Sequence, residues 1–201
     1  MPSSENGLAA NIRAPAAKPY PPGIHVPSLT FFDSSPRQEI DWTTQEQHLR
    51  FLVKSGLHGI VLAGSNGEAI ALTRSEKAEL VRLGRKVAQA EGRTDIPITL
   101  GTSGTSTRDV LDDCVAAKEA GADFVLLLVP SFFHFALTKD AICSCFEEVG
   151  DNSPLPVVIY NFPGVAAGIN LDSTMLERLS KHPNIVGVKV SPFDELERFS
   201  C

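Results

Sequence analysis

The sequence feature that most constrains this chain is a regular alternation of short apolar runs with helix-like segments, from about residue 23 to residue 191. The apolar runs are rich in β-branched residues and are expected to form strands. The segments between them begin at Ser, Thr or Asp, which are preferred at helix N-caps. About six βα steps can be counted. This alternation is typical of a parallel α/β fold, because two parallel strands need a long crossover, usually a helix, between them.

The expected strands are short, and they lie at 23–32, 59–63, 96–100, 124–129, 157–161 and 185–189. Each expected helix follows an N-cap residue, and these residues are Thr43, Thr73, Ser106, Thr138 and Asp172. Thr43 and Thr73 are each followed by Glu three residues later. This is the spacing of a capping box, in which each side chain accepts the backbone N–H of the other residue.

Two architectures fit such an alternation. A doubly wound sheet that binds a dinucleotide usually has a Gly-x-Gly-x-x-Gly turn after its first strand, and no such turn follows the first expected strand here. A (β/α)8 barrel instead collects polar residues at the carboxyl ends of many strands. In this chain those positions hold Ser65 and Asn66, Gly101 and Thr102, Tyr160 and Lys189. We therefore predict an α/β fold of the (β/α)8 TIM-barrel type.

Composition narrows the possible partners and the compartment. The 201 residues carry a net charge of −6, which disfavours nucleic acid, and no apolar run is long enough to cross a membrane. The four cysteines (Cys114, Cys143, Cys145 and Cys201) lack the paired spacing of a zinc site, so a reducing compartment is expected. The five histidines are scattered, and we interpret them as ordinary surface or loop residues.

Residues 1–22 are rich in Ser, Ala, Pro and Asn and contain no apolar signal-peptide core, so we expect a disordered N-terminal segment. This favours a cytoplasmic location. A mitochondrial location is the open alternative, although only Arg13 and Lys18 would supply the positive charge of a transit peptide.

Two of the expected strands finish on reactive side chains, Tyr160 and Lys189. A Pro/Gly-rich loop at 162–168 and a helix opened by Asp172 separate them, so both ends are expected at the same edge of a parallel sheet. A lysine at a strand end usually emerges into solvent. A partly desolvated lysine can instead attack a ketone and form a Schiff base. This unit alone leaves both interpretations open.

The segment Gly64-Ser65-Asn66-Gly67-Glu68 directly follows an expected strand. Small residues there allow close approach of a ligand, and N–H groups and hydroxyls can hold a carboxylate or phosphate. Gly and Asn are equally common in an ordinary βα turn. The aromatic residues Trp42, Phe132, Phe133 and Phe135 are expected to pack, with a role at a site or subunit interface as the alternative.

Four motifs together resemble a known family. They are residues 64–68, Pro130 with Phe132-Phe133, Tyr160-Asn161-Phe162-Pro163 with Gly168, and Asn184-Ile185-Val186-Gly187-Val188-Lys189. In this order they resemble the dihydrodipicolinate synthase/N-acetylneuraminate lyase family of class I aldolases, from about residue 23 to residue 191. The resemblance implies a (β/α)8 barrel enzyme, usually dimeric or tetrameric, whose lysine forms an imine with pyruvate or another 2-oxo acid.

By this resemblance Lys189 matches the Schiff-base lysine and Tyr160 the acid/base tyrosine. Ser65 and Asn66 match the small polar pair that binds the carboxylate of the 2-oxo acid, and we expect the Gly67 N–H to assist them. The protonated imine is itself the electron sink, so the chemistry needs no metal or cofactor. We expect a small-molecule 2-oxo acid as the partner, neither nucleic acid nor membrane, and a homo-oligomer.

Two departures from the family pattern limit the possible substrates. The loop at 164–167 lacks the arginine that the lysine-biosynthetic enzymes use, and Phe132 and Phe133 stand where those enzymes have a tyrosine. Dihydrodipicolinate synthesis is therefore disfavoured and remains the alternative within the family. The Ser-Asn pair resembles the branch of 4-hydroxy-2-oxoglutarate aldolase and L-threo-3-deoxy-hexulosonate aldolase. We expect a lyase that cleaves a hydroxy-2-oxo acid to pyruvate and an aldehyde.

The family pattern is lost after Ser191, where two further βα units are expected in a barrel of ~250 residues. We therefore expect an incomplete barrel of about six βα units at 23–191, followed by a divergent tail at 192–201. Such a C-terminally truncated chain is expected to be poorly stable and weakly active or inactive by itself. The alternative from another class is a catalytically inactive truncated paralogue that binds full-length subunits.

Overall fold

The computed structural model describes residues 18–104 and 106–191. One sheet contains six strands in the order β1 to β6, each parallel to its neighbours. The strands are β1 (His25–Pro27), β2 (Gly59–Leu62), β3 (Ile98–Thr102), β4 (Phe124–Leu128), β5 (Val157–Asn161) and β6 (Ile185–Val190). An unbroken sequential order is that of a barrel wall, whereas a doubly wound sheet reverses its order at a switch point. The expected fold class is confirmed as a curled part of a (β/α)8 barrel.

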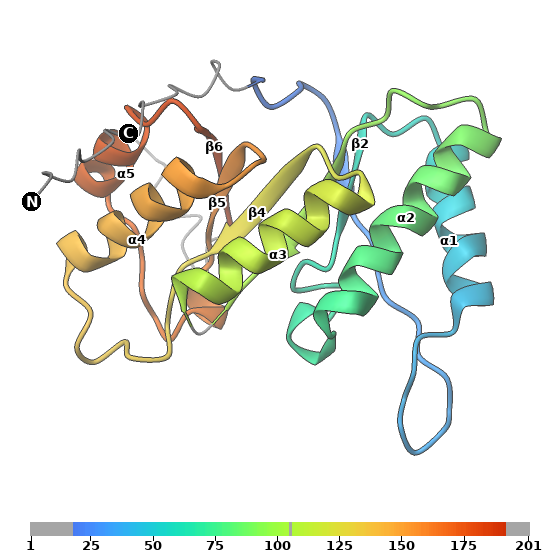
Figure 1. Cartoon of the computed structure of the whole chain (residues 1–201), viewed down its shortest axis with the longest axis horizontal. Coiled ribbons are helices and arrows are strands. Elements are labelled where there is room, and N and C mark those ends of the chain that lie inside the picture. Colours follow the sequence, from blue (N-terminus) through green and yellow to red (C-terminus); the bar gives the residue numbers. More distant parts are fainter. Residues whose placement is uncertain (1–17, 105, 192–201) are drawn as a thin grey trace, which may run out of the picture.

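The helices lie together on one side of the sheet (Figure 1). They are α1 (Trp42–Lys54), α2 (Arg74–Ala90), α3 (Thr107–Ala120), α4 (Lys139–Asn152) and α5 (Ser173–Leu179), with short 3-10 helices η1 (Ala69–Ala71) and η2 (Pro163–Val165). Across residues 18–104 and 106–191, none of the helices has both the length and the apolar character needed to cross a membrane.

Four of the five expected N-caps are confirmed. The capping box of Thr73 and Glu76 is complete, and the other three confirmed caps are Ser106, Thr138 and Asp172. The prediction for α1 is wrong. Its N-cap is Asp41, whose carboxylate accepts the backbone N–H groups of Thr43 and Thr44 at 3.1 Å each. Aspartate caps a helix at least as well as threonine, so the earlier residue starts the helix.

Some strand boundaries also differ from the expected ones. β1 is only three residues long and ends at Pro27. Proline is rare inside a strand because it cannot donate a ladder hydrogen bond. β3 begins and ends two residues later than expected, because its last residues, Gly101 and Thr102, pair with Leu126 and Leu127 of β4. Most of the expected disordered segment, residues 1–17, lies outside the described residues. The expected divergent tail at 192–201, which includes Cys201, also lies outside them.

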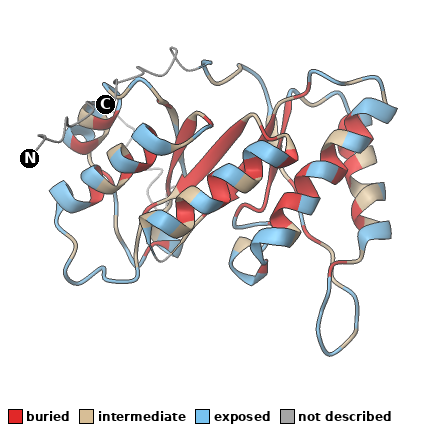
Figure 2. Ribbon diagram, viewed as in Figure 1, coloured by how far each residue is buried: buried red, intermediate tan, exposed pale blue. Residues whose placement is uncertain are grey.

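Apolar side chains form two clusters, one on each face of the sheet. The larger cluster lies between the strands and the helices and contains fully buried side chains such as Leu49, Leu80 and Phe146. Figure 2 shows the buried residues of α2 and α3 on the sides turned toward the sheet. The smaller cluster lies on the opposite face and consists of Val61, Leu126, Val158 and Tyr160. Alternation of side chains along each strand separates the two clusters.

Candidate active site

The carboxyl ends of β5 and β6 lie side by side, as expected from the sequence. Tyr160 is the direct strand partner of Lys189. The Nζ atom of Lys189 lies 4.2 Å from the centroid of the Tyr160 ring, close enough for a cation–π contact. Tyr160 is buried and Lys189 is half-buried. The lysine is therefore held against the ring and does not simply extend into solvent.

An irregularity in β6 places Lys189 on the same face of the sheet as Tyr160. The register shifts by one residue, so that Val158 pairs with Gly187 and Val186 is passed over. Because successive side chains point to opposite faces, strictly regular pairing would turn Lys189 toward the helices. One extra residue, as in a β-bulge, therefore brings the amine to the tyrosine.

The loop after β2 supplies a second polar contact. Ser65 lies with its Oγ 3.0 Å from the hydroxyl oxygen of Tyr160. Burial acts to raise the pKa of Tyr160, but the hydrogen bond with Ser65, the nearby hydroxyl of Ser191 and the charge of Lys189 outweigh it. The pKa of this tyrosine therefore lies below its ordinary value of 10.0. Such a shift favours proton transfer through the hydroxyl near neutral pH.

Ser191 is a member of the site that the sequence analysis missed. Its hydroxyl lies near enough to Tyr160 to lower the pKa of the phenol, and its backbone N–H donates to the carbonyl of Asn161 at 3.0 Å. Ser191 follows Lys189 by two residues, the spacing that returns a side chain to the same face of a strand. A hydroxyl two positions after a reactive strand-end residue is the sequence signal that could have identified it.

The expected carboxylate-binding loop is compact at one end and open at the other. Ser65 and Asn66 are exposed, whereas Gly67 is buried. A Cβ on Gly67 would lie 2.9 Å from the carbonyl oxygen of Ser28, and the Gly67 carbonyl accepts the Thr30 hydroxyl at 2.7 Å. The Gly67 N–H already donates to the carbonyl three residues earlier, at 3.1 Å. Gly67 thus lets the loop lie tightly against the segment after β1.

The same loop carries backbone strain. Ala63 and Glu68, on either side of it, have positive φ values of 49° and 52°. Non-glycine residues adopt this left-handed conformation rarely, and such residues are often found at functional sites. Gly101 at the end of β3 supports the arrangement, because a Cβ there would lie 1.9 Å from the Ala63 carbonyl oxygen. Only glycine allows this approach of β3 to the loop.

Asn161 positions the segment that follows Tyr160. Its buried side chain donates to Asn170 Oδ1 at 2.8 Å and accepts the backbone N–H of Leu171 at 3.1 Å. These two bonds tie the far end of the 162–171 loop back to the end of β5. The loop is thereby held near Tyr160, where it can contact a substrate.

The aromatic residues after β4 are on the surface, so the expectation that they pack is wrong for them. Phe132, Phe133 and Phe135 are 71%, 57% and 78% exposed. Their rings contact one another edge to face, at 4.9 Å for the first pair and 6.3 Å for the second. This cluster, which we call the aromatic loop, presents an apolar surface that suits an interface.

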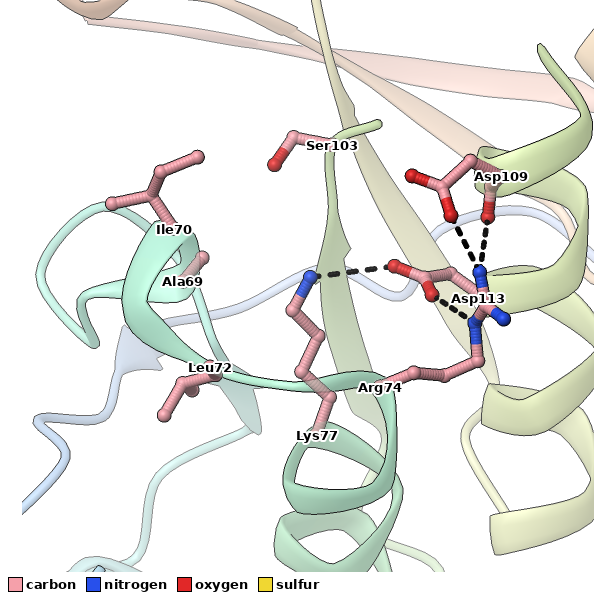
Figure 3. A pocket seen from close by; sticks show the side chains of 8 residues that line it. All are labelled: Ala69, Ile70, Leu72, Arg74, Lys77, Ser103, Asp109 and Asp113. Carbon is pink, nitrogen blue, oxygen red and sulfur yellow. Dashed lines mark hydrogen bonds and ion pairs between the residues drawn. The ribbon is translucent and has the colours of Figure 1, made fainter. Parts of the chain in front are cut away.

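A hollow of about 170 Å³ lies apart from these residues and is lined by residues of η1, α2 and α3. Figure 3 shows Arg74 and Lys77 of α2 converging there on Asp113 of α3. The distances are 2.7 Å from Arg74 Nε and 3.3 Å from Lys77 Nζ to the Asp113 carboxylate. None of Lys189, Tyr160 and Ser65 lines this hollow. The ion cluster connects two helices and is separate from the candidate active site.

Three comparisons with known proteins place these observations in context. Residues 21–198 match the model of the dihydrodipicolinate synthetase family. The chain is 42% identical over 176 residues to the "Probable 4-hydroxy-2-oxoglutarate aldolase, mitochondrial" of Emericella nidulans, covering 88% of this chain and 56% of that protein. It is 40% identical over 172 residues to the L-threo-3-deoxy-hexylosonate aldolase of Aspergillus niger, covering 85% and 51%.

Solved structures agree with the fold. A dihydrodipicolinate synthase family protein from Coccidioides immitis superposes with a TM-score of 0.74 at 42% identity, covering 88% of this chain and 53% of that one. The dihydrodipicolinate synthase of Acinetobacter baumannii, crystallised with pyruvate, gives 0.75 at 29% identity, covering 86% and 56%. The chain spans about half the length of the curated relatives it matches.

Proposed function

The chain belongs to the dihydrodipicolinate synthetase family, and we propose that its function is the Schiff-base cleavage of a hydroxy-2-oxo acid to pyruvate and an aldehyde. The observation that carries this proposal is the convergence of Lys189 and Ser65 on Tyr160. The lysine amine lies 4.2 Å from the ring centroid and the serine hydroxyl 3.0 Å from the phenol oxygen. A nucleophilic amine beside a proton-transferring hydroxyl is what imine chemistry requires.

In the proposed reaction the Lys189 amine attacks the 2-oxo carbon, and water leaves to give a protonated imine. Tyr160 then takes the proton of the substrate's C4 hydroxyl while the C3–C4 bond breaks and the aldehyde departs. The electrons of that bond move into the imine, forming an enamine that is protonated at C3. Water hydrolyses the new imine and releases pyruvate. Positioned proton transfer of this kind typically contributes on the order of 10²–10⁴ in rate.

We place the substrate carboxylate at Ser65 and Asn66, which are exposed at the open end of their loop. The role of Gly67 in this proposal is to keep the loop compact, since its N–H donates within the turn. A carboxylate fixed there would hold the ketone within reach of Lys189, which converts a bimolecular attack into an intramolecular one.

The substrate class follows from the relatives and from the 162–171 loop. The 4-hydroxy-2-oxoglutarate and L-threo-3-deoxy-hexylosonate aldolases are 40–47% identical to this chain. The 4-hydroxy-tetrahydrodipicolinate synthases are only 31–34% identical. The loop also carries no arginine to bind a second substrate's carboxylate. Both observations favour a hydroxy-2-oxo acid over dihydrodipicolinate synthesis. The contacts of Lys189 and Ser65 with Tyr160 favour catalysis over an inactive paralogue.

We also propose a homo-oligomer that uses the aromatic loop as an interface, because three exposed phenylalanines form one apolar patch. For the location, two relatives at 42% and 47% identity have names that include the word mitochondrial. This supports the mitochondrial alternative over the cytoplasmic one.

The test is an intact-mass measurement after incubation with pyruvate and borohydride, which reduces an imine to a stable secondary amine. We expect a single pyruvate adduct on the wild-type chain. Lys189→Ala should abolish the adduct, whereas Lys181→Ala, at an exposed lysine paired with Glu177, should retain it. No adduct on a sample with normal circular dichroism, or an adduct that survives Lys189→Ala, would overturn the proposal.

A further inference from the structure

The loop after β2, residues 64–68, is the place that we assign to the substrate carboxylate, and we call it the carboxylate loop. Among the described residues, two side-chain hydrogen bonds connect it to other elements. One joins Ser65 to Tyr160 inside the candidate active site. The other comes from the segment after β1, where the Thr30 hydroxyl donates to the Gly67 carbonyl at 2.7 Å. Thr30 therefore fastens the loop from outside the site.

The carboxylate loop needs such a fastening because its backbone is strained. Ala63 and Glu68 have positive φ values, and residues in this conformation persist only where the surrounding structure holds them. The backbone bonds within the loop are local, since the N–H groups of Gly67 and Ala69 both donate to the Gly64 carbonyl, at 3.1 and 3.2 Å. These bonds shape the turn, but they do not fix it relative to the sheet.

A buried glutamine of α1 fixes the position of Thr30. The Gln45 side chain is fully buried. Its Oε1 accepts the backbone N–H of Phe31 and its Nε2 donates to the carbonyl of Leu29, both at 3.1 Å. Gln45 therefore holds the backbone on both sides of Thr30. A buried amide is costly unless its hydrogen-bonding groups are paired, and here both groups are paired with this irregular segment.

The segment after β1 is also joined to the strand that precedes the carboxylate loop. The backbone N–H of Ser28 donates to the carbonyl of Val61 in β2 at 2.8 Å. Thr30 is buried against the loop, so that a Cβ on Gly67 would lie 3.3 Å from the Thr30 Oγ1. The segment after β1 is thus fixed to α1 and to β2, and its contact with the loop is made by Thr30.

We propose that Thr30, held in place by Gln45, is a positioning residue for the substrate carboxylate. It acts through the Gly67 carbonyl and thereby fixes the turn that presents Ser65 and Asn66. Without the Thr30 hydroxyl this buried carbonyl loses its donor, and the strained turn is free to shift. A carboxylate would then bind more weakly. The inference rests on the proposed function, because it concerns the binding of the 2-oxo acid in that reaction.

The proposed role separates carboxylate binding from imine formation. Lys189 and Tyr160 are positioned by the pairing of β5 with β6, so loss of the Thr30 hydroxyl should leave the attack of the amine on a ketone unchanged. Pyruvate would use the carboxylate loop, whereas acetone, which has no carboxylate, would not. A general loss of structure would affect both ketones alike, so the comparison distinguishes positioning from a merely structural role.

The test traps the imine with borohydride and measures the adduct by intact mass over a series of ketone concentrations. Thr30→Val removes the hydroxyl and keeps the branched shape of the side chain. We expect the pyruvate concentration that gives half-maximal adduct to rise at least about fivefold, as for the loss of one hydrogen bond, with the maximal adduct unchanged. The acetone series should match that of the wild type. Thr30→Ser, which restores a hydroxyl, should return the pyruvate value toward that of the wild type.

Ser35→Ala is the matched control, because it removes a hydroxyl from the same β1–α1 connection, where Ser35 donates to Asp33 at 2.7 Å. It should behave like the wild type with both ketones. An unchanged pyruvate series in Thr30→Val would overturn the positioning role and leave the proposed reaction standing. Equal weakening with pyruvate and acetone would overturn the role as well. A wild-type chain that forms no pyruvate adduct would instead overturn the proposed function, and this inference with it.

Discussion

At the residue scale, the two tyrosines of the chain occupy opposite electrostatic settings. Tyr160 meets hydroxyls and a cationic amine, which lower its pKa despite burial. Tyr20 is subject chiefly to burial, which raises its pKa, while its bond with Thr99 opposes this only in part. The same side chain therefore suits proton transfer in one place and a purely structural bond in the other.

A spectrophotometric titration of tyrosinate absorbance checks this difference, since the chain contains only these two tyrosines. We expect two steps, one below and one above the ordinary pKa of 10.0. Tyr160→Phe should remove the lower step and Tyr20→Phe the upper one. Ser65→Ala should move the lower step to higher pH, because it deletes a hydrogen bond that stabilises the phenolate. A lower step that persists in Tyr160→Phe would contradict the assignment.

At the element scale, α2 and α3 are joined by a buried ion cluster and not by apolar contacts alone. Lys77 and Asp113 are each only 6% exposed, and Thr102 at the end of β3 also donates to Asp113, at 3.3 Å. A buried ion pair contributes little net stability, but removing one partner leaves the other charge unpaired. The cluster thereby fixes how the two helices sit on β3.

Asp113→Ala should reduce the free energy of unfolding by roughly 3–5 kcal/mol, because it leaves Lys77 buried without a counter-ion. Asp112→Ala, one residue away and with a side chain 57% exposed, should change it by less than about 1 kcal/mol. Urea unfolding followed by circular dichroism measures both. Replacing Lys77 and Asp113 together by Met and Leu should recover most of the loss. Equal effects of the two aspartate substitutions would refute this account.

At the scale of the whole molecule, the described sheet has two edge strands, β1 and β6, and an apolar surface at the aromatic loop. The outward side chains of β6, Val188 and Val190, are 44% and 46% exposed. Exposed apolar groups that lie together usually mark an association surface. The aromatic loop is the larger group, because its three exposed phenylalanine rings lie in contact with their neighbours.

Sedimentation velocity can test whether the aromatic loop mediates self-association. Phe133→Asp should shift the chain toward smaller species, because a charge in the centre of an apolar interface is desolvated without a partner. Phe51→Asp is the matched control, since Phe51 is 67% exposed on α1, away from this loop. If both variants sediment like the wild type, the aromatic loop is not the interface.

The sequence by itself determined the parallel α/β class, four of the five helix starts, and the placement of Tyr160 and Lys189 at the same edge of the sheet. These features depend on local signals, namely N-cap residues, β-branched runs and the βα alternation, which act over a few residues. The family followed from motif order for the same reason, because each motif is a short contiguous segment.

Only the tertiary structure decided the rest. The register shift that passes over Val186 turns Lys189 to the same side as Tyr160. This shift depends on pairing between strands and cannot be seen in the pattern of apolar residues. Ser191 and Tyr20 likewise acquire their roles from partners on other strands. Hydrogen bonds between distant segments depend on register and on the twist of the sheet, and these are properties of the packed molecule rather than of any local stretch.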